Sequence, residues 1–158
     1  MWQLLVWVES TALPTWVREG DTIWAYPTIL TLHTFGLAMV VGTSAILNLR
    51  LLGIGGHLPL SRMRDLFPVM WIGFCLNAIT GLLLFAADAA AKGSSPLFAA
   101  KLLFVAVGVA AIVVLERAGY YGADGDLALV SRPAKLLALC SLVCWVAAVT
   151  AGRLLAYV

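Results

Sequence analysis

Residues Pro27 to Leu52 read PTILTLHTFGLAMVVGTSAILNLRLL, an apolar run that is long enough to cross a membrane and that carries a histidine. A helix rises about 1.5 Å per residue, so about 20 apolar residues span the hydrocarbon of a bilayer. Asn48 and Arg50 end the run at its far surface. Because an ionisable side chain inside a bilayer is costly, His33 marks a candidate functional site near the start of this span.

The composition of the chain is that of a membrane protein. Of its 158 residues, 63% are hydrophobic and only 11% are charged. A soluble domain of this size needs far more polar surface, so lipid must be the solvent over most of the outside. The formal net charge is +2, and there is no basic patch with interleaved aromatic residues. We therefore exclude nucleic-acid binding and expect a single membrane domain.

The apolar runs predict an all-α integral membrane protein, a four-transmembrane up-and-down helix bundle with an N-terminal interfacial amphipathic helix. Residues 1–22 are expected to form the interfacial segment, in which Pro14 should break the helix, and residues 23–158 the bundle. The connections between spans are short, which makes successive spans antiparallel. The spans are expected at residues 27–49, 66–87, 97–115 and 133–155, with a KGSSP turn before the third and the loop ERAGYYGADGDLALVSR before the fourth.

The distribution of lysine and arginine predicts the orientation. The connections after the first and third spans carry six such residues, which are Arg50, Arg62, Arg64, Arg117, Arg132 and Lys135. The opposite side carries four, which are Arg18, Lys92, Lys101 and Arg153. Since positive residues favour the cytoplasmic side, both termini are expected outside the cytoplasm, with the six basic residues at the inner surface.

Four polar side chains from three spans are expected at one depth, in the outer leaflet. They are His33, Asn77, Thr80 and Lys101. Glycines accompany each of them along the helix, namely Gly36, Gly73, Gly81 and Gly108. Glycine on an inner face permits close packing of spans, and it also leaves room for a flat ligand. Arg153, near the end of the last span, is interpreted as an interfacial anchor.

Two roles are open for His33. A neutral imidazole in an apolar slot is typical of an axial ligand to haem iron. The alternative is a histidine hydrogen-bonded to a neighbouring helix through Asn77 or Thr80. A second axial ligand is not obvious among His57, Met39 and Met70, so five-coordinate iron or a symmetric pair of subunits would be needed.

Lys101 also has more than one interpretation. Its long stem could carry the ammonium to the outer surface. Otherwise it would pair with an anionic group such as a porphyrin propionate, or carry a proton. The cysteines lie inside apolar runs without a disulfide framework, and Cys140 with Cys144 shares one helix face in a spacing compatible with Cu(I).

The first span, LHTFGLAMVVGTSAILNLRLLGIGG, resembles that of a family of uncharacterised four-span bacterial inner-membrane proteins, and the likeness extends to MRDLFPVMWIGFCLNAITGLLLF and SPLFAAKLLF. More distantly, the order of elements resembles the HemJ-type protoporphyrinogen oxidases. Those proteins also have a histidine early in the first span, an arginine-leucine end to it, a Gly-Leu-Leu motif closing the second span and a lysine opening the third. The last third departs, because this chain has GYYGADGD and SRPAKLLALCSL where that family has further histidines and an Asn-Glu-x-Pro element.

The resemblance implies a haem-binding oxidoreductase of the bacterial inner membrane, with His33 as the metal ligand to haem b and Lys101 as the second residue needed for activity. Gly36, Asn77 and Thr80 would complete the cofactor site. The leading hypothesis is therefore a haem or porphyrin-binding protein with a redox or porphyrin-oxidation role that passes electrons to quinone.

An alternative hypothesis is a non-catalytic accessory or structural subunit of a larger membrane complex, which the small loops and the aromatic start favour. A small-molecule transporter is less favoured, because there is no broken-helix pair or repeated half. A homodimer is a further candidate, since Thr34, Ala38 and Gly42 form a small-residue stripe that could face another span or another protomer.

Overall fold

The computed structural model describes residues 2–121 and 130–157, which form seven α-helices and one 3-10 helix. In chain order these are α1 (Trp2–Glu9), α2 (Ala12–Glu19), α3 (Tyr26–Leu51), η1 (Leu60–Leu66), α4 (Phe67–Ala86), α5 (Ala89–Gly93), α6 (Pro96–Arg117) and α7 (Arg132–Leu154). The loop predicted before the last span falls mainly on residues 122–129, which lie outside the described residues.

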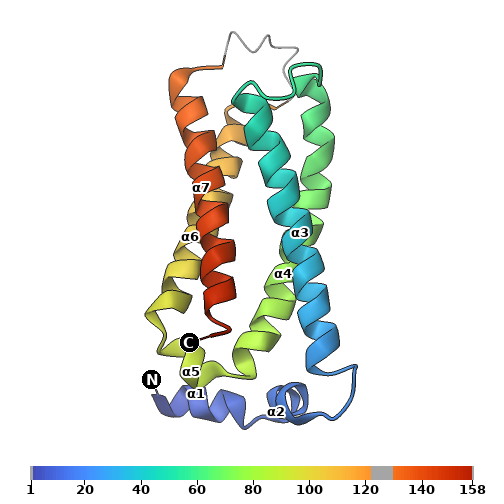
Figure 1. The fold of residues 1–158 in the computed structure, drawn as a ribbon, viewed down its shortest axis with the longest axis vertical. Helices are drawn as coiled ribbons and strands as arrows, with labels where there is room; N and C mark the ends of the chain where they lie inside the picture. The colour runs from blue at the N-terminus through green and yellow to red at the C-terminus, as the bar shows by residue number, and fades with distance from the viewer. Residues whose placement is uncertain (1, 122–129, 158) are drawn as a thin grey trace.

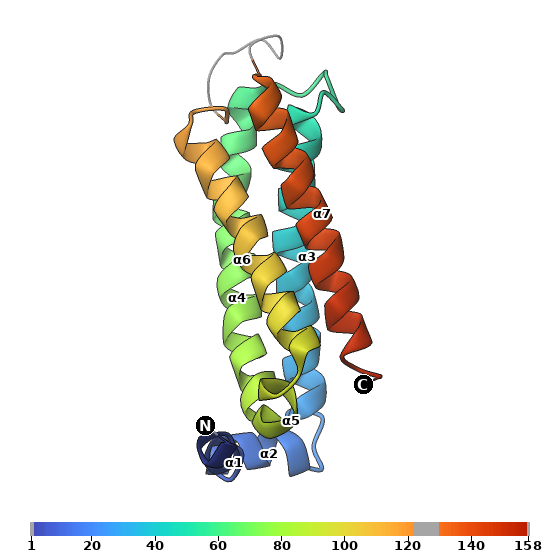
Figure 2. The ribbon, with the colours of Figure 1, turned by 90° about the vertical axis from the view of Figure 1, so that its left-hand side faces the viewer.

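Four long helices, α3, α4, α6 and α7, run up and down side by side (Figures 1 and 2). Each is long and apolar enough to cross a membrane, which confirms the four predicted spans and the all-α bundle. Each also carries a proline in its first turn, where the missing N–H costs nothing: Pro27, Pro68, Pro96 and Pro133. Both chain termini lie at one end of the bundle, which we call the terminal end; the opposite end is the far end (Figure 1).

The outer surface of the bundle is apolar. Phe35, Leu82 and Leu136 are 61%, 68% and 67% exposed. Such a surface is suited to lipid and not to water. The small-residue stripe of Thr34, Ala38 and Gly42 also faces outward, and a Cβ at Gly42 would meet no atom within 4 Å. Of the two orientations left open for it, the structure therefore shows the one that faces away from the other spans.

The helices pack as two antiparallel pairs, α3 with α4 and α6 with α7, and the pairs meet chiefly where α3 contacts α7. Gly36 and Gly73 allow the close approach of α3 and α4, because a Cβ on Gly36 would lie 2.7 Å from the Asn77 backbone nitrogen and 2.9 Å from the Gly73 oxygen. The main hydrophobic core fills the far half of the bundle and includes Leu47, Leu51, Ile112, Leu115 and Trp145.

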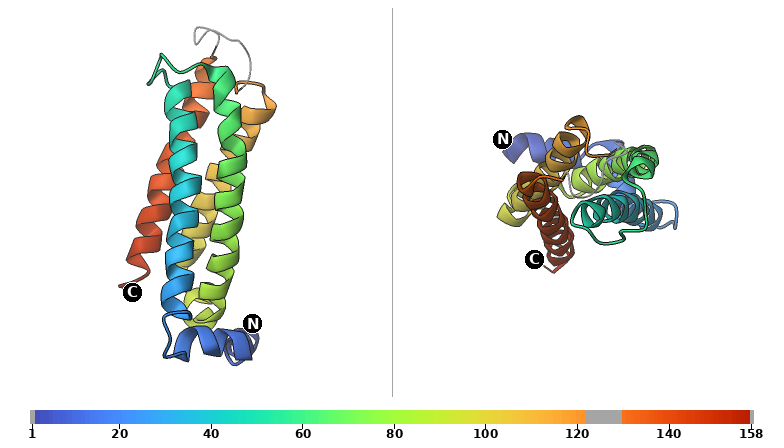
Figure 3. Two further views of the ribbon diagram at one scale, coloured as in Figure 1. Left: turned by 90° about the vertical axis from the view of Figure 1, so that its right-hand side faces the viewer. Right: turned by 90° about the horizontal axis from the view of Figure 1, so that it is seen from above.

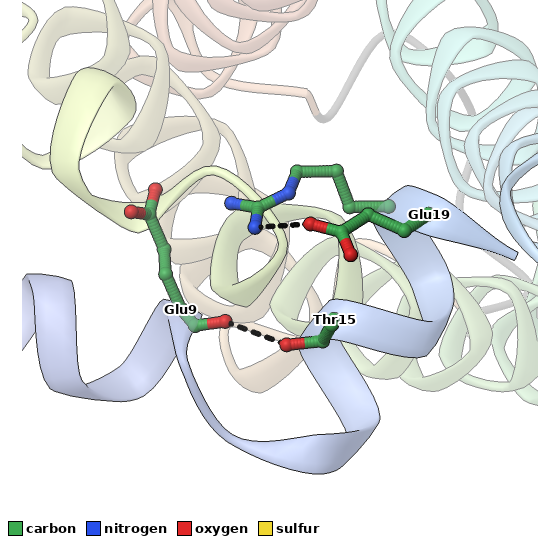
Figure 4. A network of polar contacts seen from close by, with 4 residues as sticks. Glu9, Thr15 and Glu19 are labelled. Atoms are coloured by element: carbon green, nitrogen blue, oxygen red, sulfur yellow. Dashed lines mark hydrogen bonds and ion pairs between the residues drawn. The ribbon is translucent and has the colours of Figure 1, made fainter.

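Helices α1 and α2 lie across the terminal end of the bundle (Figures 1 and 3), which is the arrangement expected of an interfacial segment. At the corner between them, the Thr15 hydroxyl donates to the Glu9 backbone oxygen at 3.2 Å (Figure 4). The Glu9 carboxylate accepts from the Ala90 backbone N–H at 3.0 Å, which ties α1 to α5. These contacts hold the N-terminal segment against the bundle.

Three local expectations are wrong. Pro14 does not break the first helix; it lies in the first turn of α2, where proline is tolerated, and the break falls at Ser10 and Thr11. The turn before α6 contains the short helix α5. Arg50 is not a surface charge but is only 5% exposed, because its guanidinium turns back to donate to the backbone oxygens of Leu58 and Gly56.

Candidate functional site

The sequence-predicted polar residues meet at a cleft of about 230 Å³ near the terminal end, where α3, α4, α6 and α7 face one another. His33 from α3 and Lys101 from α6 both line it. The cleft reaches the outside, since Tyr26, Arg153 and Ala156 on its rim are exposed. Its remaining lining residues are Leu30, Gly81, Leu84, Phe85, Lys92, Phe98, Gly152 and Leu155.

A larger groove of about 450 Å³ lies between the outer faces of α6 and α7. Thr150 is the one polar side chain among its described lining residues, which are otherwise apolar. Such a groove suits an acyl chain of the surrounding lipid better than it suits chemistry. We therefore place the candidate site in the cleft that holds His33.

The His33 ring is held by two groups of α4. Its Nδ1 lies 3.1 Å from the Asn77 backbone oxygen and 3.1 Å from the Thr80 Oγ1. The Thr80 hydroxyl already donates to the Leu76 oxygen at 2.6 Å, so toward His33 its oxygen can only accept. Both partners of Nδ1 are therefore acceptors, and Nδ1 carries the proton of the neutral ring.

This tautomer leaves the lone pair of Nε2 available. A histidine that ligates a metal usually donates its other ring N–H to a carbonyl, carboxylate or water, and this bond fixes the ring. The hydrogen-bonded alternative predicted for His33 is thus confirmed, and the same bonds orient the ring as a ligand would require. The two predicted roles are compatible with each other.

Asn77 strengthens the arrangement from the side-chain amide. Its Nδ2 donates to the His33 backbone oxygen at 2.9 Å and lies 3.4 Å from both ring nitrogens. One turn further along α4, a Cβ on Gly81 would lie 3.1 Å from His33 Cε1. A side chain at Gly81 would therefore crowd the imidazole, and glycine there leaves the ring its position.

Positive charge predominates around the cleft. Lys101 is half-buried, its stem lies on Gly152, and among the described residues it has neither a hydrogen-bond partner nor an ion pair. Lys92 donates to the Leu84 oxygen at 2.7 Å and lies 3.7 Å from the Asp88 carboxylate. Arg153 lies 5.9 Å from the ring centre of Tyr157. Lys101 is therefore the cation available to an anionic ligand.

Two aromatic rings close the wall between α4 and α6. Phe85 and Phe98 stack with their ring centres 5.2 Å apart and their planes 13° from parallel. Both rings line the cleft beside Lys101. The cleft thus combines an imidazole, an ammonium and flat apolar surfaces.

The predicted site residues separate into three groups. His33 and Lys101 line the cleft, whereas Asn77 and Thr80 hold the His33 ring from behind. Gly36 lies in the contact between α3 and α4 and does not line the cleft, and Gly108 lies against Trp145 deeper in the bundle. Lys92, Phe85, Phe98 and Gly152 line the cleft and were not predicted; an aromatic residue near each end of the connection between α4 and α6 is the signal that could have found the two rings.

Metal ligation by protein side chains alone is not supported among the described residues, where no group of three or more histidine, cysteine or acidic residues is close enough to hold an ion. None of the candidates for a second axial ligand lines the cleft: Met70 lies in the main core, His57 in the connection at the far end and Met39 in the contact of α3 with α4. A metal held here would have His33 as its one ligand from the described residues.

Comparison of the chain with protein-family models, with curated proteins and with solved structures finds no match. The function must therefore be argued from the chemistry of the cleft itself.

Proposed function

We propose that the protein is a multi-pass membrane protein that binds an anionic, flat amphiphile in the cleft, with haem b as the ligand and His33 as its axial ligand. The observation that carries the proposal is the presence in one cleft of an imidazole with a free Nε2 and of an ammonium without a partner among the described residues. An imidazole suits haem iron, and an ammonium suits a propionate carboxylate.

The residues of the cleft fit this ligand in donor type and in charge. The bonds from Asn77 and Thr80 keep the Nδ1 proton in place, which leaves Nε2 for iron. Lys101 would hold a propionate, and Phe85 and Phe98 offer flat apolar contacts. The volume of about 230 Å³ is below the 300 to 1,000 Å³ of sites that enclose a ligand of drug size, so a macrocycle would also occupy the open side toward lipid.

The proposed role is redox chemistry or porphyrin oxidation, with quinone as the electron acceptor. Exchange of single electrons is what haem supplies when bound. His33 would fix the position of the iron, and the half-buried surroundings would limit the access of water. Lys101 would neutralise an anionic group next to the reacting centre and is the candidate catalytic residue.

We place the protein in the bacterial inner membrane with both termini outside the cytoplasm. The lysine and arginine asymmetry of the connections supports this orientation, and the position of both termini at one end is compatible with it. A C-terminal fusion to alkaline phosphatase should be active and a fusion to green fluorescent protein dark. The reverse pattern would put the termini inside.

Binding of a porphyrin to the purified protein tests the role of Lys101. Protoporphyrin IX, which is anionic and metal-free, should bind the wild type, and Lys101→Gln should weaken binding by about tenfold, or about 1.4 kcal/mol. Lys135→Gln, the same change at the far end of α7, should leave the affinity unchanged. Equal affinity of Lys101→Gln and wild type would remove the ammonium from the proposed site.

A further inference from the structure

A second cluster of polar side chains lies in the far half of the bundle, away from the cleft. The Asn48 side-chain amide of α3 donates to the Ser141 hydroxyl of α7 at 3.1 Å. The Ser141 hydroxyl in turn donates to the Gly108 backbone oxygen of α6 at 3.3 Å. Asn48 and Ser141 are both 0% exposed. A buried hydrogen-bond chain therefore crosses three helices.

One helical turn nearer the cleft, two more polar side chains face each other. Ser44 precedes Asn48 by four residues and Trp145 follows Ser141 by four. Because α3 and α7 are antiparallel, both residues are displaced in the same direction and reach the same level. The Trp145 indole packs on Gly108, where a Cβ would lie 3.3 Å from its Nε1, so the ring has a fixed place beside the chain.

Three buried atoms of this cluster have no hydrogen-bond partner among the described residues: Ser44 Oγ, Asn48 Oδ1 and Trp145 Nε1. Ser44 is exceptional, because every other serine or threonine hydroxyl of the four long helices makes a hydrogen bond; Thr43, its neighbour, donates to the Met39 oxygen at 2.6 Å. Unpaired buried polar atoms are uncommon, and several side by side usually share an unseen partner.

We propose that Ser44, Asn48 and Trp145 bind one internal water molecule. The water accepts from the Trp145 N–H, donates to Asn48 Oδ1 and uses its remaining capacity on the Ser44 hydroxyl, so all three atoms gain a partner. A buried water typically makes two to four such bonds. The hydrogen bonds of the cluster involve no charged side chain, which favours water over an ion.

The position of this water gives it a structural consequence. It lies where α3 meets α7, which is the main contact between the two helix pairs. A water bonded to both helices would join the pairs at this level, and it does so independently of any ligand in the cleft.

The indole N–H of Trp145 reports the water directly. Ultraviolet resonance Raman spectra, taken as wild type minus Trp145→Phe, isolate the tryptophan band that responds to hydrogen bonding of Nε1. We expect a hydrogen-bonded indole in the wild type. Ser44→Val places a methyl group in the water site and should shift the band to the position of a free indole, whereas Thr43→Val, a matched change on the next residue, should not.

A free indole in the wild type would overturn the proposal. A bonded indole that Ser44→Val leaves unchanged and Asn48→Leu frees would also overturn it, since Trp145 would then pair with Asn48 directly. If Ser44→Val does not fold, a high-resolution structure of the wild type decides: density for one water within about 3.2 Å of all three atoms supports the site, and empty or protein-filled space contradicts it.

Discussion

His33 on α3 and Thr80 on α4 are joined by a 3.1 Å hydrogen bond between Nδ1 and Oγ1, across 47 positions of sequence. Thr80 directs its own proton to Leu76, so it presents only an acceptor to the imidazole. This single contact fixes which ring nitrogen of His33 carries hydrogen. It links the packing of the first two spans to the chemistry that the cleft can perform.

Loss of the Thr80 hydroxyl should loosen this link. Thr80→Val keeps the shape of the side chain and removes one acceptor of the His33 N–H, so we expect a loss of about 0.5 to 1 kcal/mol in the free energy of unfolding. Unfolding by denaturant in detergent micelles would measure it. Thr150→Val is the matched control, because Thr150 is exposed and bonds only to the Val146 oxygen of its own helix at 2.9 Å. Equal changes in the two variants would mean that the contact with His33 adds nothing.

Gly36 should tolerate no larger side chain. A Cβ at this position would lie 2.7 Å from the Asn77 backbone nitrogen, so Gly36→Ala must push α3 and α4 apart. We expect it to lower the free energy of unfolding by about 1 to 3 kcal/mol. Gly42→Ala, on the outer face of the same helix, meets no atom within 4 Å and should be neutral or raise stability by up to about 1 kcal/mol. Thermal unfolding of both variants checks the pair, and a Gly36→Ala variant as stable as Gly42→Ala would contradict the packing.

Tyr121 should make stability depend on alkaline pH. Burial raises the pKa of its phenol, because desolvation disfavours the phenolate. In the unfolded chain the pKa is about 10. Stability is therefore constant below pH 10 on account of this group and falls by up to about 1.4 kcal/mol per pH unit above it, since the unfolded chain ionises first.

Tyr121→Phe should remove this pH dependence. At neutral pH it should cost little, because the Tyr121 hydroxyl has no hydrogen-bond partner among the described residues. Tyr157→Phe serves as the control, since Tyr157 is 74% exposed. Denaturant unfolding at pH 8 and near pH 11 compares the three proteins, and an unchanged pH slope in Tyr121→Phe would show that another group titrates.

Much of the fold could be predicted because hydrocarbon imposes simple rules. Apolar runs of fixed length locate the four spans, and the antiparallel order brings His33, Thr80 and Lys101 to one depth. Depth can be counted along the sequence at a constant rise per residue. The contact of His33 with α4 follows from that count.

The remainder depends on which way each helix is turned about its axis, and the weak amphipathicity of these spans does not determine it. Gly36 and Gly81 both precede or follow polar residues, yet one packs between helices and the other lies beside the His33 ring. Ser44 and Trp145 face each other only because of the register of α3 against α7. Lys92 enters the cleft from the connection containing α5, where a span-based analysis does not look.

The most direct test of the proposed function is the visible spectrum of the detergent-purified protein, oxidised and then reduced with dithionite, after expression with haem available. The wild type should have a Soret band that sharpens and shifts on reduction. His33→Ala should lose it, whereas His57→Ala, which removes the other histidine of the chain at the far end, should keep it. A colourless wild type, or a His33→Ala protein with an unchanged spectrum, would contradict ligation of haem by His33.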